Sequence, residues 1–381
     1  MRSNLISSNV FLVAFLHIFL LIHSKPLVPA LYVFGDSLFD SGNNNLLPTV
    51  AKANYPPYGL NFGEHLTGTF TNGRTLPDFI DVVTVPPFII SKKSILKYLS
   101  LENINFDVPA LYVFGDSYVD AGNNNYVHVP QIERNYTPYG IDFGGKPTGR
   151  YTNGRTVADF IAQIVGLPFP PPVLSLSKGD KRIPQTGINY ACGFTGILEK
   201  FGKLFERMPS LKEQVDLFES TTKGLQSQFQ SKESFSRYLS KSLFFINSVA
   251  YDLDIEWDGL RYFYDENYYT QLLIKDLSKH LQRLYQLGAR KIVVNNASPI
   301  GCQPHLISGG FTDVRSSCCT EIDKGLTKPC LANVAPCKDR SSHVFFDPMH
   351  PSESMHFIWA RRLLKDSSVS SPINLIQLIQ S

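Results

Sequence analysis

The sequence predicts a three-layer α/β/α domain in which helices cover both faces of a central parallel sheet. One observation is the run at residues 111–114, four apolar or aromatic residues ended by Gly115, which is typical of a buried parallel strand. A second is that further short apolar runs, at residues 242–247 and 291–294, alternate with longer amphipathic segments. This alternation favours a parallel sheet, because parallel strands need long crossover connections that are usually helical.

Apolar residues at spacings of three and four predict the helices. One such pattern runs through residues 157–165 and is ended by Gly166 and by the prolines that follow. The longest helix is expected at residues 268–287, where repeated leucines form a stripe that we interpret as core, and Gly288 ends it. A short strand is expected at 187–191, and further helices at 211–225, 233–239 and 355–364.

Charge and the first residues of the chain bear on partners and location. A net charge of +3 over 381 residues, without a basic stripe, argues against a nucleic-acid partner. Residues 1–24 combine Arg2 with an apolar stretch at 10–22, the pattern of a secretory signal peptide. A membrane anchor is the alternative, but this stretch is short for a bilayer span. We therefore expect a secreted, extracellular protein with no stable membrane span once the signal is removed.

Secretion permits disulfides, and five of the six cysteines lie in the last third of the chain. Their spacing leaves the pairing open. A zinc site is disfavoured because no CxxC pair is present, so no metal is expected. Asn135 and Asn296 stand in glycosylation acceptor patterns, as expected for a secreted glycoprotein.

An internal repeat divides the chain, because residues 30–80 and 110–161 share the phrases ALYVFGDS, GNNN, PYG, NGRT and DFI. Only the second copy continues into further strands and helices. We therefore expect a partial duplicate with a connector at 25–109, the main domain at 110–365 and a C-terminal tail at 366–381. Alternatively, residues 30–34 of the first copy occupy the same central strand position.

Ser117 follows the expected strand at 111–114, and ligand chemistry in such folds lies outside the carboxyl ends of the strands. Near the other end of the chain, Asp347 precedes His350 by three residues, which allows the carboxylate to reach one ring nitrogen while the other faces a serine. The alternatives are a simple turn at Gly115–Ser117 and a helix start at His350. We interpret Ser117 as nucleophile, His350 as base and Asp347 as the group that orients the base.

Three longer blocks strengthen this interpretation: FGDSYVDAGNNN from Phe114, YTNGRTVADFIA from Tyr151 and DPMHP from Asp347. Together they resemble the plant GDSL esterase/lipase family of the SGNH hydrolase superfamily. The resemblance implies a flavodoxin-like fold and a secreted serine esterase or lipase that hydrolyses acyl or acetyl carboxylic esters through an acyl-enzyme. It implies a small-molecule or lipid ester as substrate, a role in lipid metabolism, and no metal or organic cofactor.

The resemblance also implies an oxyanion hole formed by the Ser117 N–H, a glycine N–H after the second strand and an asparagine amide after the third. The glycine is Gly193 or Gly196, and a tight turn is the alternative role for both. At the third position the sequence departs from the family, because Val249 replaces the usual glycine and Tyr251 the asparagine.

A second departure lies between Val294 and Phe346, where no helix-plus-strand unit is found. We therefore expect the sheet to lack its last edge strand. The two departures support an alternative function: a catalytically weak or inactive relative that acts as a binding protein, or a defective duplicate.

Overall fold

The protein divides into two units, Met1–Thr84 and Val85–Ser381. The computed structural model describes residues 42–46, 48–49, 52–55, 68, 70, 91–176, 183–198, 208–248, 250–253, 265–295, 317–319, 322–323, 326–327, 330–340, 343–366 and 369–381. In the first unit the described part includes a 3₁₀ turn, η1 (Asn43–Asn45), which follows Gly42 in the left-handed conformation. The expected signal peptide and most of the first repeat lie outside the described residues.

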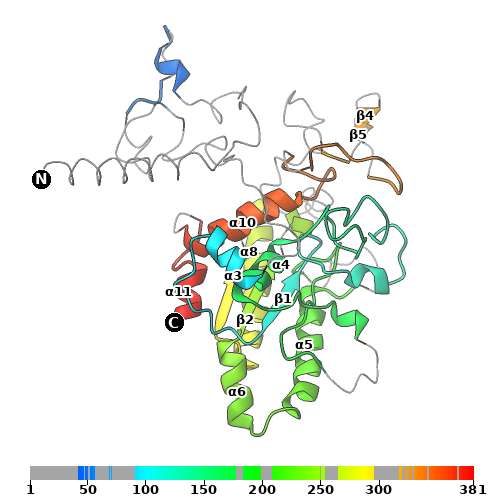
Figure 1. Ribbon diagram of the computed structural model, residues 1–381, viewed down its shortest axis with the longest axis vertical. Helices are drawn as coiled ribbons and strands as arrows, with labels where there is room; N and C mark the ends of the chain where they lie inside the picture. The colour runs from blue at the N-terminus through cyan, green and yellow to red at the C-terminus, as the bar shows by residue number, and fades with distance from the viewer. Residues whose placement is uncertain are drawn as a thin grey trace, which may run out of the picture. The chain divides into compact units, whose positions relative to one another are not determined.

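Three parallel strands form the central sheet of the second unit: β1 (Leu111–Gly115), β2 (Leu243–Asn247) and β3 (Lys291–Val294), in that order (Figure 1). Every residue of β1 and β2 is buried, so both faces of the sheet centre are covered. The predicted α/β class and these three strands are confirmed. The expected loss of a strand beyond β3 falls largely on residues outside the described part of the chain.

A fourth segment runs along the other edge of β1. Val113 N–H donates to the Ile188 carbonyl at 3.1 Å, and Tyr190 N–H donates to the Val113 carbonyl at 2.7 Å. These bonds are parallel ladder bonds, with one isolated bridge between Val113 and Asn189. The strand expected at 187–191 is therefore present as a short ladder.

The described helices are α3 (Lys92–Tyr98), α4 (Val157–Val165), α5 (Leu211–Gln226), α6 (Lys232–Lys241), α8 (Glu266–Gln286), α10 (Glu353–Lys365) and α11 (Leu375–Gln380). Helices α4, α5, α6, α8 and α10 lie where the periodicity of the sequence predicts them. Two 3₁₀ turns, η2 (Asn123–Tyr126) and η3 (Val173–Ser175), and a separate antiparallel pair, β4 (Ile322–Asp323) with β5 (Leu326–Thr327), complete the described elements. Helix α11 was not predicted; it lies in the segment expected as a C-terminal tail, buries Leu375 and Ile379 and packs on α10 and β3.

Aromatic side chains of the strands form the core on the face covered by α5, α6 and α8. Phe218 of α5 meets Tyr112, Phe114 and Phe244 with ring centroids 5.1, 5.8 and 5.5 Å away. Helices α3, α4 and α10 pack on one another in a second group. Burial of aromatic rings of this size is a dominant stabilising contribution, because each removes 150–250 Å² of surface from water.

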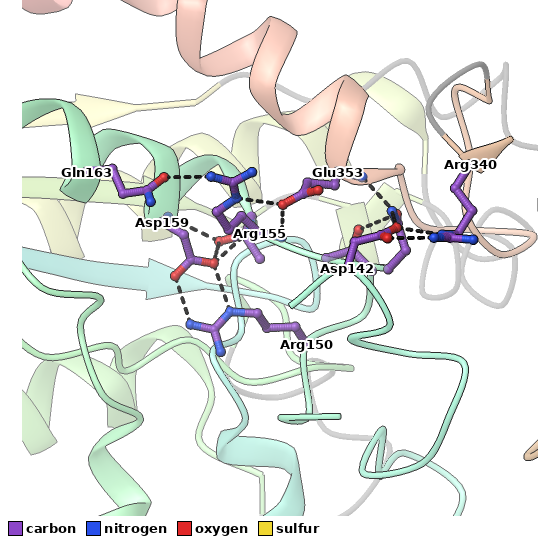
Figure 2. A network of polar contacts seen from close by, with 10 residues as sticks. Asp142, Arg150, Arg155, Asp159, Gln163, Arg340 and Glu353 are labelled. Atoms are coloured by element: carbon purple, nitrogen blue, oxygen red, sulfur yellow. Dashed lines mark hydrogen bonds and ion pairs between the residues drawn. The ribbon is translucent and has the colours of Figure 1, made fainter. Parts of the chain in front are cut away.

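Helix α4 begins with a capping box and a buried ion pair. Thr156 caps the helix, and the Asp159 carboxylate accepts the Thr156 N–H in return at 2.8 Å. The same carboxylate receives two bonds of 2.8 Å from the Arg150 guanidinium, and both side chains are nearly inaccessible to water (Figure 2). Burial raises the pKa of Asp159, but Arg150 and Thr156 lower it by more, so the net pKa is below its ordinary value.

We expect Arg150→Met to lower the free energy of unfolding by about 3–5 kcal/mol, because it leaves the buried Asp159 carboxylate without its counter-charge. Lys212→Met is the control, since Lys212 pairs with Asp216 in an exposed i,i+4 bridge whose loss costs less than about 1 kcal/mol. Urea denaturation of both variants measures the difference. Equal costs would contradict the assignment of Arg150–Asp159 as a buried structural pair.

Candidate active site

Ser117 lies just beyond the carboxyl end of β1, where Gly115 makes the close approach to β2 possible. Gly115 has a φ of 144°, and a Cβ at this position would lie 1.9 Å from the Asn247 carbonyl oxygen. The next peptide N–H, that of Asp116, donates to the same carbonyl at 3.0 Å. Only a glycine fits here, so the strand end that carries Ser117 is fixed against the end of β2.

The buried carboxylate of Asp116 fixes the serine loop further. It accepts hydrogen bonds from the Tyr118 N–H at 3.1 Å, the Ala250 N–H at 3.1 Å and the Asn247 side-chain amide at 3.2 Å. Because Ala250 and Asn247 belong to the end of β2 and the loop after it, one carboxylate joins that loop to the serine loop. The position of Ser117 is therefore determined by two adjacent strands together.

The structure brings together the three side chains that the sequence singled out. His350 Nε2 lies 2.9 Å from Ser117 Oγ, and His350 Nδ1 lies 2.9 Å from both carboxylate oxygens of Asp347. We call these three residues the triad. A hydroxyl, an imidazole and a carboxylate bonded in this order form the arrangement that activates a serine for acyl transfer.

The Asp347 carboxylate is buried, and both of its oxygens accept hydrogen bonds. The backbone N–H groups of Met349 and His350 donate to its Oδ1 at 2.9 and 2.7 Å, and the Tyr139 hydroxyl donates to Oδ2 at 2.5 Å. Burial raises the pKa of the Asp347 carboxyl, but the His350 imidazole and the hydrogen bonds from His350 and Tyr139 lower it by more, to about 2. The carboxylate is therefore ionised wherever the imidazole is needed as a base.

Two aromatic rings hold the His350 imidazole in place. The Tyr151 ring lies 4.7 Å from the imidazole centroid and the Tyr118 ring 5.8 Å. The Tyr118 hydroxyl also donates to the Met349 carbonyl at 3.0 Å, next to the histidine. Only 3% of His350 is exposed, so its ring has little freedom to turn away from Ser117.

The Asp347–His350 turn is anchored on both sides. On one side, the N–H groups of Cys318 and Cys319 donate to Phe345 and Phe346 at 3.1 and 2.7 Å. The two cysteines form disulfides with Cys337 and Cys330, respectively. The sequence predicted disulfides but not this pairing; Cys192 is buried and free, and Cys302 lies outside the described residues.

On the other side, α10 begins directly after the turn and is held by a polar network (Figure 2). The Glu353 carboxylate accepts the backbone N–H and the Nε–H of Arg155 at 3.0 and 2.6 Å, and both side chains are buried. The Asn153 side chain accepts the Glu353 N–H and donates to Asp142, which also pairs with Arg340. The NGRT phrase thus ties the segment that carries the histidine to the N-terminal half of the domain.

Comparison with known proteins identifies the family of the chain. A family model described as GDSL-like Lipase/Acylhydrolase matches residues 111–363. The chain belongs to this family. It is 38% identical to a GDSL esterase/lipase of Arabidopsis thaliana over 273 residues, which covers 66% of this chain and 83% of the relative. It is 34% identical to GDSL esterase/lipase 7 of the same plant over 338 residues, covering 71% and 92%. At the level of the GDSL family, the chain is a hydrolase of ester substrates.

Both glycines expected at the oxyanion hole of this GDSL domain lie where no side chain fits. A Cβ on Gly193 would lie 2.2 Å from the Tyr151 hydroxyl, and one on Gly196 would lie 2.4 Å from an Asp252 carboxylate oxygen. The Gly193 N–H donates to Asp120 at 2.9 Å, whereas the family resemblance gives the N–H of either Gly193 or Gly196 to the oxyanion. The lack of space for a side chain is therefore enough to explain why glycine stands at both positions, with or without a role in an oxyanion hole.

Tyr251 stands where the resemblance implies an asparagine. It is buried, and its ring lies edge-on to Phe194 with centroids 6.5 Å apart. The following residue, Asp252, accepts the Ile197 N–H and so joins this loop to the glycine loop. Val249 lies outside the described residues.

The described residues contain one group with metal-ligand chemistry, Cys318, Cys337 and His343. Its two sulfurs are bonded to each other, so they cannot act as thiolate ligands. The sequence analysis missed Tyr139, Tyr151 and Arg134 around the triad. The signal for Tyr139 was the PYG phrase, which occurs in both repeats.

The low pKa of Asp347 predicts a pH dependence of stability. Its folded pKa of about 2 is below its ordinary 3.8, so its contribution is complete above pH 4 and is lost as the pH falls through 2. The Asp347→Asn variant has no carboxylate at this position and therefore lacks this pH-dependent contribution to the free energy of unfolding. We expect the stability gap between wild type and Asp347→Asn to narrow by about 1 kcal/mol from pH 5 to pH 3. Urea denaturation at each pH measures the gap, and a constant gap would contradict the assignment.

Proposed function

We propose that the protein is a secreted serine esterase that hydrolyses acyl or acetyl carboxylic esters through an acyl-enzyme. The observation that carries the proposal is the 2.9 Å contact between Ser117 Oγ and His350 Nε2, two atoms from residues 233 positions apart. Membership of the GDSL family supports it. A buried, ionised Asp347 behind the imidazole adds the third group that such chemistry uses.

In the proposed reaction, Ser117 Oγ attacks the ester carbonyl while His350 Nε2 takes its proton. Asp347 stabilises the imidazolium through Nδ1. The imidazolium then protonates the leaving alcohol, and the acyl group stays on Ser117. Water, deprotonated by His350, releases the carboxylic acid and restores the serine. No metal or organic cofactor enters these steps.

The proposed oxyanion donors are the backbone N–H of Ser117 and that of Gly193 or Gly196. The absence of the family asparagine is expected to lower the turnover rate, because loss of one side-chain donor from an oxyanion hole lowers turnover about 10²–10³-fold. We therefore expect an active but slow enzyme. Tyr251 is the residue that limits it.

Secretion is proposed from the first 24 residues and from the two disulfides, which persist in oxidising compartments. The exposed Asn135 suits glycosylation. No helix within the described residues has the length and hydropathy needed to cross a bilayer. A small-molecule or lipid ester in the extracellular space is the proposed substrate.

The alternative function, a weak or inactive relative that binds rather than cleaves, is favoured by two observations. Tyr251 lacks the amide of the family asparagine, and the Gly193 N–H is donated to Asp120. Both observations concern the oxyanion, whereas the triad is complete. Kinetics on a reactive ester therefore separate the two functions.

We expect Ser117→Ala to lower kcat for p-nitrophenyl acetate and butyrate by at least about 10³-fold, because no other group replaces the nucleophile. Ser37→Ala, which changes the matching serine of the first repeat, is the control and should leave kcat unchanged. Equal rates for wild type and Ser117→Ala would contradict the esterase proposal and favour the alternative function of a binding protein. A loss in Ser37→Ala would assign the nucleophile to the first repeat.

Tyr251→Asn should raise kcat on the same esters by about tenfold or more, because it supplies a side-chain amide where the family has one. Tyr251→Phe is the matched control, since it removes the hydroxyl without adding an amide, and it should bring no increase. Stopped-flow or steady-state release of p-nitrophenol measures both. An unchanged kcat in Tyr251→Asn would contradict the role given to this position.

A further inference from the structure

The carboxylate of the triad has a partner that comes from a distant loop. The Tyr139 hydroxyl donates to Asp347 Oδ2 at 2.5 Å, and only 2% of Tyr139 is exposed. We propose that Tyr139 is a positioning residue, whose hydroxyl fixes Asp347 and thereby controls how readily His350 takes the proton of Ser117. The inference rests on the proposed function, and it adds Tyr139 as a group that supports the triad through Asp347.

The two oxygens of Asp347 are held in different ways. Oδ1 is held by N–H groups of its own turn, those of Met349 and His350. Oδ2 receives the Tyr139 hydroxyl, which belongs to a segment 208 positions earlier. Without that hydroxyl, Oδ2 still faces the imidazole of His350 but has lost the hydrogen bond from Tyr139. Tyr139 therefore sets the orientation of the carboxylate as well as its charge density.

The Tyr139 ring has little freedom to move. It lies edge-on to Phe346 at 5.4 Å and to Tyr136 at 5.3 Å, and it belongs to the core cluster that contains Cys318, Cys319 and Cys330. The Arg134 guanidinium lies 5.4 Å from the Tyr139 ring and 4.8 Å from the Tyr151 ring, which packs on His350. One cation thus contacts the rings behind both the carboxylate and the imidazole.

The hydroxyl remains a donor over the working pH range. Burial raises the pKa of Tyr139 well above its ordinary value, and Asp347 raises it further, so the phenol keeps its proton. Burial lowers the pKa of Arg134, but Tyr139, Tyr151 and Asp347 raise it by more, so this charge is permanent. Within the described part of the chain, the titratable groups around Asp347 and His350 are Arg134, Tyr118, Tyr136, Tyr139, Tyr151 and His356. Asp120 and Cys192 lie next to Tyr151 in turn.

Removal of the hydroxyl has two effects with predictable signs. The Asp347 carboxylate loses a donor and becomes more basic, so it holds the imidazolium of His350 more strongly. The base must be neutral to act, and the acid limb of the kcat/KM profile therefore moves to higher pH. The carboxylate is also less well oriented, which lowers kcat. A merely structural role would lower stability without moving this limb.

The test compares Tyr139→Phe with Tyr112→Phe in the full chain. Tyr112 is a matched control because its buried hydroxyl bonds the Tyr238 hydroxyl at 2.7 Å in the core. With p-nitrophenyl butyrate, Tyr139→Phe should lower kcat about tenfold with KM nearly unchanged and should move the acid limb to higher pH. Tyr112→Phe should leave that limb in place. An unmoved limb in Tyr139→Phe, or an equal shift in both variants, overturns the proposal.

A second readout does not depend on activity. The low-field proton resonance of His350 Nδ1–H, identified by its absence in His350→Gln, should move in Tyr139→Phe but not in Tyr112→Phe. If no ester is hydrolysed and the resonance still moves, the proposed function fails and the positioning role stands. If hydrolysis depends on Ser117 and neither the limb nor the resonance moves, the positioning role fails.

Discussion

Buried carboxylates fix the loops of this domain relative to one another, because a carboxyl group removed from water must be satisfied by hydrogen bonds or counter-charges. Asp116 accepts from the loop after β2, Asp120 from Gly193, and Asp252 from Ile197. Asp347 accepts from Tyr139, and Glu353 from Arg155. Each carboxylate joins segments distant in the chain, so the strand ends, the glycine loop and the histidine turn form one polar assembly.

This assembly separates the parts of the site that agree with the GDSL family from the part that departs. The serine, histidine and carboxylate meet at hydrogen-bond distance, and their supports come from both halves of the domain. Among the described residues of the site, the departure from the resemblance is Tyr251, whose ring packs on Phe194. Asp252 and Ala250 of the same loop are anchored by hydrogen bonds to the Ile197 N–H and to the Asp116 carboxylate, on either side of Tyr251.

Local patterns account for what the sequence predicted. Helix α4 was predictable because its apolar periodicity is bounded by Thr156 and Gly166, and β1 because a short apolar run ends in glycine. Ser117 and His350 were predictable from their motifs. The contact of Tyr139 with Asp347 was not predictable: the repeated PYG phrase marks the segment, but Tyr139 lies in a loop without periodicity and its partner is 208 residues away. Helix α11 is a single short stretch, and the cysteine pairing depends on how the chain folds back, which spacing does not encode.

The adjacent cysteines Cys318 and Cys319 carry a practical consequence. Their loops are nested, since the partner Cys330 lies between Cys319 and Cys337, and both loops brace the backbone immediately before Asp347. A chain folded where thiols stay reduced keeps β1 and its serine hydroxyl but lacks these braces. Material made in a reducing bacterial cytosol would then have a less well-oriented carboxylate, and its turnover would reflect the oxidation state of the preparation in addition to the effect of Tyr251.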